Sequence, residues 1–144
     1  MSQTSTNSNA PGASVLVAED NPMNQRVIGA FLKSLGVAHV ICENGQEAID
    51  HLCEADYALV LMDIQMPVLD GITAIRLIRS GATPRSDIPV VVVTANAMAG
   101  DRDTYLGAGA DGYLPKPFTL DAMRTVLDQF ALLPVASAKV ASAS

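Results

Sequence analysis

The sequence predicts an α/β protein with a doubly wound parallel sheet of five strands. Short apolar runs alternate with segments of helical periodicity five times along the chain, as expected for repeated strand–helix units. The runs are continuously apolar, as in residues 90–93, Val-Val-Val-Val, so the strands are expected to be buried on both faces. The chain is too short for a closed eight-stranded barrel, and an open sheet with helices on both faces and right-handed crossovers fits it better.

The first strand–helix unit carries the clearest boundary signals. An apolar strand over 15–18 is followed by Asn21 as an N-cap and by Pro22 at the first helical position. Gly36 is expected to end this helix. The residues predicted on its inner face recur at helical spacing: Met23, Val27, Ile28, Phe31, Leu32 and Leu35.

The other four units follow the same alternation. We predict the remaining strands over 37–42, 57–62, 90–93 and 112–114. The helix after Asn44-Gly45 has Ala48, Ile49, Leu52 and Cys53 facing inward, and the helix from Asp70-Gly71 has Ile72, Ile75 and Ile78. The last two helices are predicted over 98–107 and over 120–132, the latter capped by Thr119. The helix over 98–107 is polar and weakly patterned, so we expect it to be exposed and mobile.

Composition and charge restrict the function classes. The 144 residues, 49% of them apolar, predict one folded domain over 14–133 between a flexible leader, 1–13, and an Ala/Ser-rich tail, 134–144. The formal charge of 9 − 15 = −6 argues against nucleic-acid binding. No apolar run is long enough to span a membrane, and no signal peptide is recognisable. Cys42 and Cys53 lack metal or redox spacing, which indicates reduced core thiols in a cytoplasmic protein. We expect no direct contact with a membrane.

Polar side chains that could form one site follow four of the five predicted strands. Glu19 and Asp20 follow the first strand, Asp63 the third, Thr94 the fourth and Lys116 the fifth. The second strand contributes no residue to this set, as expected for an edge strand remote from a site. Because parallel strands end at the same edge of a sheet, these side chains are expected to converge there. Asp63 alone would more often be a residue that merely ends a strand, but the convergence favours a functional site.

The chemistry of this set points to phosphoryl transfer. Three clustered carboxylates raise one another's pKa unless a cation lies between them, and oxygen ligands of this kind suit Mg²⁺. Lys116 adds a positive charge and Thr94 a hydroxyl donor. Since phosphoryl transfer needs mainly positioning and charge neutralisation, these residues predict an aspartyl phosphate on Asp63.

These motifs resemble the receiver domain of response regulators in two-component signalling. The resemblance covers residues 14–132 and rests on four segments: Glu19-Asp20, 62–71 (Met-Asp-Ile-Gln-Met-Pro-Val-Leu-Asp-Gly), 93–97 (Val-Thr-Ala-Asn-Ala) and 113–117 (Tyr-Leu-Pro-Lys-Pro). It implies a flavodoxin-like (βα)5 fold with the strand order 2-1-3-4-5.

The resemblance also implies a metal site and a path for water. Asp63 would be the phosphoacceptor, Asp20 would bind Mg²⁺ directly, and Glu19 would act mainly through a metal-bound water. The backbone carbonyl of Gln65 would complete the protein ligands. Gln65 and Asn96 would flank the path of the hydrolytic water. Neutral amides orient water but are poor bases, so we hypothesise a moderately long-lived phosphoryl group.

The remaining implied roles concern the phosphoryl oxygens and the conformational switch. Thr94 and Lys116 would hold phosphoryl oxygens. Tyr113 would be an aromatic switch whose rotamer follows Thr94. The bond between Lys116 and Pro117 is implied to be cis, which only a bond before proline makes inexpensive.

The partner is implied by the kind of receiver. Residues 21–25 and 94–101 resemble receivers of hybrid histidine kinases more than those of transcription factors. We therefore expect a histidine kinase or histidine phosphotransfer domain as the partner, with Met23 and Phe118 as candidate apolar contacts. Packing in the core is an equally good interpretation of Met23. We favour a receiver from a hybrid kinase over a stand-alone response regulator, and a monomer, although the sequence leaves the oligomeric state and the input signal open.

Three other functions remain as alternatives. A Mg²⁺-dependent phosphohydrolase with an aspartyl nucleophile generally carries a second Asp where this chain has Gln65. A flavin-binding module needs a phosphate-binding loop after the first strand, where Glu19 and Asp20 would repel a phosphate. A degenerate receiver is disfavoured because the signature positions are all present. We expect a signalling domain that catalyses only its own phosphorylation and dephosphorylation, not an enzyme.

Overall fold

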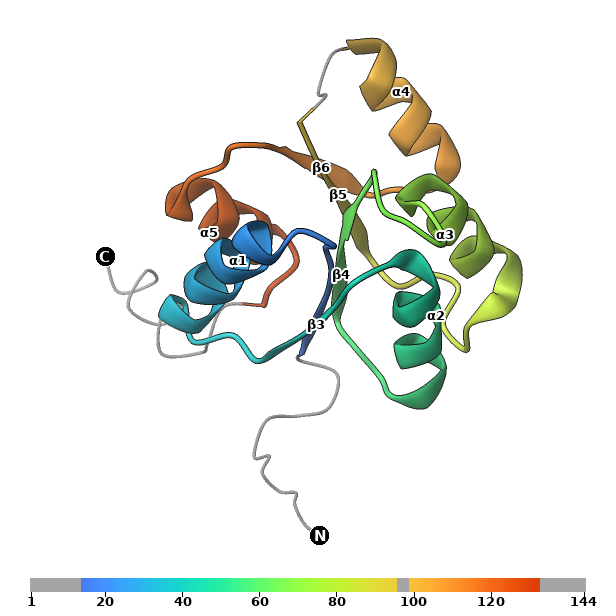
Figure 1. Cartoon of the computed structure of the whole chain (residues 1–144), viewed down its shortest axis with the longest axis horizontal. Coiled ribbons are helices and arrows are strands. Elements are labelled where there is room, and N and C mark those ends of the chain that lie inside the picture. The colour runs from blue at the N-terminus through green and yellow to red at the C-terminus, as the bar shows by residue number, and fades with distance from the viewer. Residues whose placement is uncertain (1–13, 96–98, 133–144) are drawn as a thin grey trace, which may run out of the picture.

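The computed structural model describes residues 14–95 and 99–132, in which strands and helices alternate throughout (Figure 1). The strands of this part of the chain are β2 (Val15–Ala18), β3 (His39–Cys42), β4 (Leu59–Asp63), β5 (Val90–Thr94) and β6 (Gly112–Pro115). The helices are α1 (Pro22–Ser34), α2 (Gly45–Glu54), α3 (Gly71–Leu77), α4 (Ala99–Ala108) and α5 (Leu120–Gln129), and a π-helical turn, η2 (Ile78–Ala82), continues α3.

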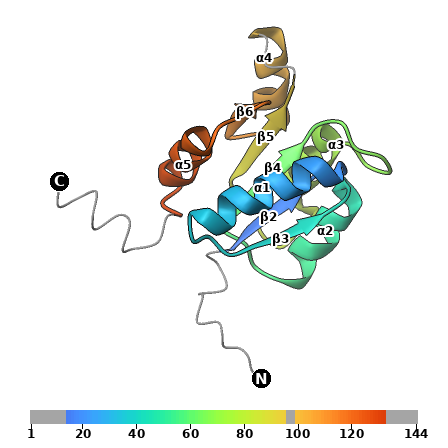
Figure 2. The ribbon, with the colours of Figure 1, turned by 60° about the vertical axis from the view of Figure 1, so that its left-hand side comes forward.

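The five strands form one parallel sheet in the order β3-β2-β4-β5-β6. Since β2 is the first of these strands along the chain, this confirms the predicted order 2-1-3-4-5. Helices α1 and α5 cover one face of the sheet, and α2, α3 and α4 cover the other (Figure 1). Figure 2 shows α1 on the near side of the strands, with α2 and α3 on the far side. β3 lies at the edge of the sheet, as expected for the second strand, and Glu43, which directly follows it, is not among the carboxylates that cluster at the ends of β2 and β4.

Two apolar layers hold the sheet between the helices. Every residue of β2, β4 and β5 is buried, as the continuous apolar runs predict. Because side chains alternate along a strand, Val60, Met62 and Val92 belong to the layer under α2, α3 and α4. Leu61 and Val93 belong to the layer under α1 and α5. The same alternation continues to the ends of the strands, where the polar residues lie.

The N-caps predicted at Asn21 and Thr119 are both present. The side-chain oxygen of Asn21 accepts from Met23 N–H at 2.8 Å, so it satisfies a donor that the first turn of α1 leaves free. Asn44, Asp70 and Thr119 cap α2, α3 and α5 in the same way. Each cap joins residues two or three positions apart, which is why the sequence predicts them well.

Three residues predicted to face the core are exposed. Met23 is 65% exposed and Val27 39%, whereas Ile28 and Leu32 of the same helix are buried. Met23 and Val27 form a neighbouring row four residues apart, and α1 turns the row of Ile28 and Leu32 toward the sheet instead. Cys53, in the last turn of α2, is an exposed free thiol and not a core thiol.

Several boundaries also differ from the predicted ones, and for the strands the reason is that a strand ends where its pairing ends. The strand predicted over 37–42 begins at His39, the one over 57–62 runs from Leu59 to Asp63, and α5 ends at Gln129. Helix α4 is mostly exposed, as expected, but Tyr105 and Ala108 are buried. Its mobility stays a prediction.

No described helix is both long and apolar enough to cross a membrane. The predicted leader, 1–13, the tail, 134–144, and Asn96 lie outside the described residues.

Arg79 ties the end of the α3–η2 helix to the two segments that lead into β5 and β6. Its Nε donates to the carbonyl oxygen of Gly109 at 2.9 Å, and Nη1 donates to those of Ser86 and Ile88 at 2.7 Å each. Its Nη2 pairs with the Asp111 carboxylate at 2.8 Å. One side chain thus fixes the approaches to two strands that carry site residues.

Candidate functional site

Three carboxylates converge where β2 and β4 end. Asp63 is the last residue of β4, and Glu19 and Asp20 directly follow β2. The pairing of Ala18 with Met62 brings the next residue of each strand, Glu19 and Asp63, side by side. One oxygen from each of Glu19, Asp20 and Asp63 lies within 4.8 Å of the other two. We refer to these three residues as the carboxylate cluster.

The members of the carboxylate cluster differ in burial. Glu19 is 1% exposed and Asp63 6%, whereas Asp20 is exposed. Asp20 lines an open hollow together with Gln65, Met66 and other residues of the β4–α3 loop. The cluster is therefore closed on the sheet side and reachable from solvent on the Asp20 side, beside Gln65.

Gly71 lets the loop after Asp63 fold back against the end of β4. Its backbone N–H donates to the carbonyl oxygen of Ile64 at 3.0 Å. A Cβ at this position would lie 2.2 Å from the backbone oxygen of Asp63. Only glycine allows this approach, so the Asp70-Gly71 pair both starts α3 and seats the loop beside the cluster.

Lys116 lies between the two buried carboxylates. Its Nζ is 3.1 Å from Glu19 Oε1 and 3.3 Å from Asp63 Oδ1. The Lys116 backbone N–H donates to the carbonyl oxygen of Thr94 at 2.7 Å, which fixes the residue directly after β6. The bond from Lys116 to Pro117 is cis, as the resemblance implies.

One ammonium does not neutralise this site. Burial, and then the carboxylate of Glu19, raise the pKa of Asp63 from 3.8 to about 6, while Lys116 opposes the rise. Glu19 Oε1 is fully buried and accepts no well-directed hydrogen bond, although Lys116 lies near it. Oxygen-only donors, excess negative charge and an unsatisfied buried oxygen are what a hard divalent cation such as Mg²⁺ relieves. The residues present therefore fit a magnesium ion.

Thr94 contacts a residue that the sequence did not point to. Thr94, the last residue of β5, is 3% exposed, and its Oγ1 lies 3.1 Å from the hydroxyl of Tyr105 on α4. Tyr105 is 5% exposed. The spacing of Tyr105 and Ala108, three residues apart in a mostly polar helix, was the signal in the sequence for a buried face of α4.

Tyr113, the predicted aromatic switch, lies half-buried in β6. The guanidinium carbon of Arg102 lies 5.1 Å from the centroid of its ring, a cation–π contact from α4. Asn96, predicted to lie by the water path, falls outside the described residues. Gln65 lies in the exposed loop beside Asp20, so its side chain is open to solvent near the cluster.

An apolar groove adjoins the site. It has a volume of about 340 Å³ and is lined by Val27 of α1, by Lys116 and by Phe118, among others. Phe118 is half-buried and packs edge-to-face on Phe31 with ring centroids 5.8 Å apart. Of the two predicted partner contacts, Met23 is thus exposed on α1, and Phe118 lines the groove.

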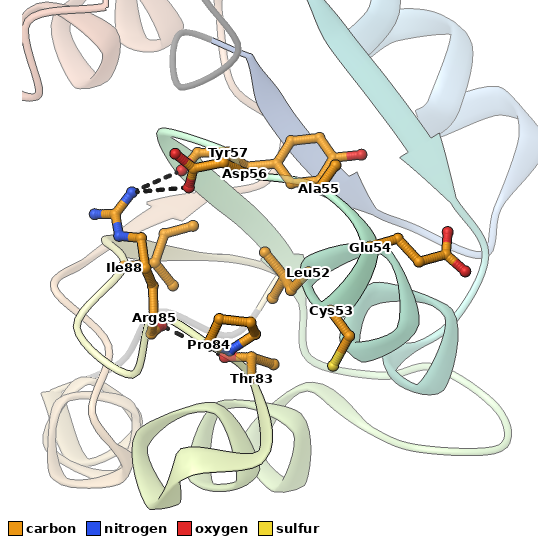
Figure 3. A pocket seen from close by; sticks show the side chains of 10 residues that line it. All are labelled: Leu52, Cys53, Glu54, Ala55, Asp56, Tyr57, Thr83, Pro84, Arg85 and Ile88. Carbon is orange, nitrogen blue, oxygen red and sulfur yellow. Dashed lines mark hydrogen bonds and ion pairs between the residues drawn. The ribbon is translucent and has the colours of Figure 1, made fainter.

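A second hollow, of about 400 Å³, lies at the opposite end of the sheet (Figure 3). It is lined by residues that precede β4 and β5, including Tyr57 and Ile88. Figure 3 shows Arg85 reaching across it to Asp56, with an Nη1–Oδ1 distance of 3.4 Å. It is remote from the carboxylate cluster, which is the only group of three potential metal ligands among the described residues.

Comparison with known proteins agrees with this geometry. A family model of the response regulator receiver domain matches residues 15–128. The signal transduction histidine-protein kinase BarA of Escherichia coli (strain K12) is 41% identical over 114 residues, which are 78% of this chain and 12% of BarA. The chain therefore spans only a small part of this relative's length.

Solved structures with the same fold include receivers from bacteria and yeast. The receiver domain of sensor histidine kinase PA1611 from Pseudomonas aeruginosa PAO1, with a magnesium ion coordinated in its active-site cleft, is 39% identical with a TM-score of 0.76, covering 83% of this chain and 97% of that one. A second match is a chain of the co-crystal structure of the Saccharomyces cerevisiae phosphotransfer protein Ypd1 with the receiver domain of Ssk1. It is 32% identical with a TM-score of 0.76, and the match covers 83% of this chain and 89% of that chain.

Proposed function

The chain belongs to the response regulator receiver domain family, and from that premise we propose that it accepts a phosphoryl group from a phosphohistidine onto Asp63. The observation that carries this proposal is the setting of Asp63. Asp63 is the last residue of β4, and its carboxylate is buried beside Glu19. The Lys116 ammonium lies 3.3 Å from one of its oxygens. The site therefore offers a nucleophile and a fixed positive charge at one point.

The proposed reaction transfers the phosphoryl group between two side chains. An oxygen of ionised Asp63 attacks phosphorus, the bond from phosphorus to the donor's imidazole nitrogen breaks, and that nitrogen keeps the electron pair. Lys116 and Thr94 hold phosphoryl oxygens as charge moves onto them. With a pKa of about 6, Asp63 is mostly ionised at neutral pH and ready to attack.

Receiver domains bind Mg²⁺ at their acidic site, and the carboxylate cluster fits this role here. We propose that Asp20, Asp63 and the backbone carbonyl of Gln65 bind the ion and that Glu19 acts through a bound water. When bound, Mg²⁺ neutralises oxygens of the phosphoryl group and the cluster. Gln65 and Asn96 are proposed to orient the water that later hydrolyses the aspartyl phosphate, slowly because neither amide is a good base.

The proposed donor is a histidine kinase or a histidine phosphotransfer domain. The related Ssk1 receiver was crystallised with the phosphotransfer protein Ypd1, which supports this class of partner. The groove beside Lys116, with Phe118 and the exposed Met23 on α1, is the surface we propose for it. We further propose that the protein is a monomer that acts on no external substrate. We propose that it derives from a hybrid kinase such as those it resembles, and that it lies in the cytoplasm, where free thiols like Cys42 are usual.

Intact mass after incubation with acetyl phosphate and Mg²⁺ tests the proposal. The unmodified chain should gain about 80 Da, the mass of one phosphoryl group in place of a proton. Asp63→Asn should gain nothing, and Asp103→Asn, at an exposed site on α4, should behave like the parent. A parent chain that gains no mass, or an Asp63→Asn chain that does, contradicts the proposal. Multiple turnovers of a phosphate ester would favour the phosphohydrolase instead.

A further inference from the structure

The buried contact between Thr94 and Tyr105 has no part in the reaction as described so far. We propose that Tyr105 is a positioning residue that holds the Thr94 hydroxyl on the α4 side of the sheet and competes for it with the phosphoryl group. This inference rests on the proposed function of Asp63 and Thr94. It adds a residue of α4 that sets how readily the phosphorylated state forms.

The alternation of side chains along the strands places Thr94 away from the other site residues. Thr94 follows Val90 and Val92, which belong to the layer under α2, α3 and α4. Asp63 follows Leu59 and Leu61, which belong to the layer under α1 and α5. The Thr94 side chain therefore starts on the opposite face of the sheet from Asp63, and its hydroxyl contacts Tyr105 at 3.1 Å.

The side chains of Lys116 and Glu19 lie on the same face of the sheet as that of Asp63. Lys116 follows Leu114, and Glu19 follows Val17, and both of these belong to the layer under α1 and α5. These residues point toward the phosphoryl position without turning, as their short distances to each other indicate. Thr94 alone among the predicted phosphoryl-binding side chains must reorient.

The chemistry of the hydroxyl groups makes this a competition. Phosphoryl oxygens only accept hydrogen bonds, so Thr94 must donate its proton to them. A rotation of the Thr94 side chain from one staggered position to another turns Oγ1 from Tyr105 toward the end of β5. A hydrogen bond to a charged acceptor is roughly twice as strong as one between neutral groups, so the phosphoryl group can displace the Tyr105 hydroxyl.

The contact of Tyr105 with Thr94 can be removed without disturbing the packing around it. Its ring is buried in the apolar layer and its hydroxyl reaches Thr94, so Phe can replace it with the packing retained. The same helix also holds Tyr113 through Arg102. Helix α4 thus contacts both predicted switch residues, and release of Thr94 removes one of its two described ties to them.

Titration with beryllofluoride and Mg²⁺, a stable mimic of the aspartyl phosphate, tests the competition. By calorimetry, Tyr105→Phe should bind beryllofluoride about three- to tenfold more tightly than the parent, the effect of removing one neutral hydrogen bond from the free state. Tyr57→Phe removes a phenolic hydroxyl from the same apolar layer at the opposite end of the sheet, so it should leave the affinity for beryllofluoride unchanged. In a Thr94→Val background, Tyr105→Phe should have no effect.

The outcomes separate this inference from the proposed function. If the parent binds no beryllofluoride, the proposed function fails, and the inference fails with it. If the parent binds and Tyr105→Phe binds equally or more weakly, the competition is wrong and the proposed function stands. Should Tyr105→Phe not fold, ¹³C-labelled tyrosine in the parent decides: the Tyr105 ring carbon bearing the hydroxyl must shift on beryllofluoride binding, and no shift overturns the inference.

Discussion

Replacing Asp63 by asparagine is predicted to stabilise the protein at neutral pH when no divalent cation is present. In the folded protein, burial and the Glu19 carboxylate raise the pKa of Asp63 from 3.8 to about 6, an elevation that remains despite the attraction of Lys116. The folded state thus prefers the protonated form of Asp63. Asparagine imitates that form, since it has the same shape and no charge, and it cannot ionise.

The sign and size of the effect follow from the two pKa values. A carboxyl group whose pKa is raised by folding contributes stability that is fully present below 3.8 and is lost as the pH rises through about 6. The shift corresponds to about 3 kcal/mol at pH 7.5, because one pKa unit is about 1.4 kcal/mol. The free energy of unfolding of Asp63→Asn should therefore exceed that of the parent by about 1.5 to 4 kcal/mol at pH 7.5.

Urea denaturation at several pH values, with EDTA present, measures this difference. The advantage of Asp63→Asn should fall below about 1 kcal/mol at pH 4, where both states of the parent hold the proton for much of the time. Asp103→Asn, which also removes one negative charge but from an exposed site, should change the free energy of unfolding by less than about 0.5 kcal/mol at every pH. An Asp63→Asn chain that is less stable than the parent at pH 7.5, or an advantage independent of pH, would refute the reasoning. Mg²⁺ should stabilise the parent at pH 7.5 and narrow the gap.

Three further predictions concern the scaffold. Arg79→Met should lower the free energy of unfolding by about 1 to 3 kcal/mol, because it removes the donor to three carbonyl oxygens, two of them in part-buried hydrogen bonds. Arg76→Met, on the exposed face of α3, should cost less than about 0.5 kcal/mol, and equal effects of the two substitutions in urea denaturation would contradict the role of Arg79. Burial raises the pKa of Cys42 to about 12. A thiol reagent at pH 8 should therefore label one cysteine, Cys53, in the folded protein and two cysteines after unfolding. If mass spectrometry finds Cys42 modified first, the burial of Cys42 is wrong. Val68 has a φ of 69°, which is costly for a β-branched side chain, so Val68→Asn should raise the free energy of unfolding by about 0.5 to 1 kcal/mol, and a loss of stability would argue against this backbone conformation.

Much of the fold was predictable from the sequence because its signals are local. The caps at Asn21 and Thr119 join residues two or three positions apart, and the continuous apolar runs need no knowledge of their neighbours. The carboxylate cluster was predictable for a different reason. The rule that parallel strands end at one edge turns distant positions in the sequence into neighbours, and it correctly brought Glu19 and Asp63 together.

Other features depended on how the helices are turned against the sheet. The periodicity of α1 did not reveal that the row of Ile28 and Leu32 faces inward while Met23 and Val27 face solvent, because both rows are apolar. The inward side of α2 likewise excludes Cys53. These choices are made by the packing of each helix against the strands, which the sequence of the helix alone does not encode.

The site shows the same division. Residue type and strand position were enough to predict that Asp63, Thr94 and Lys116 lie at one edge of the sheet, since the ends of parallel strands converge by geometry. The hydrogen bond between the hydroxyls of Thr94 and Tyr105 was not predictable, because it depends on the rotation of α4 about its own axis and on which face of β5 the threonine occupies. Side chains held by long-range packing are visible only in the folded structure, because no local pattern distinguishes a tyrosine that fills the core from one that also holds a site residue.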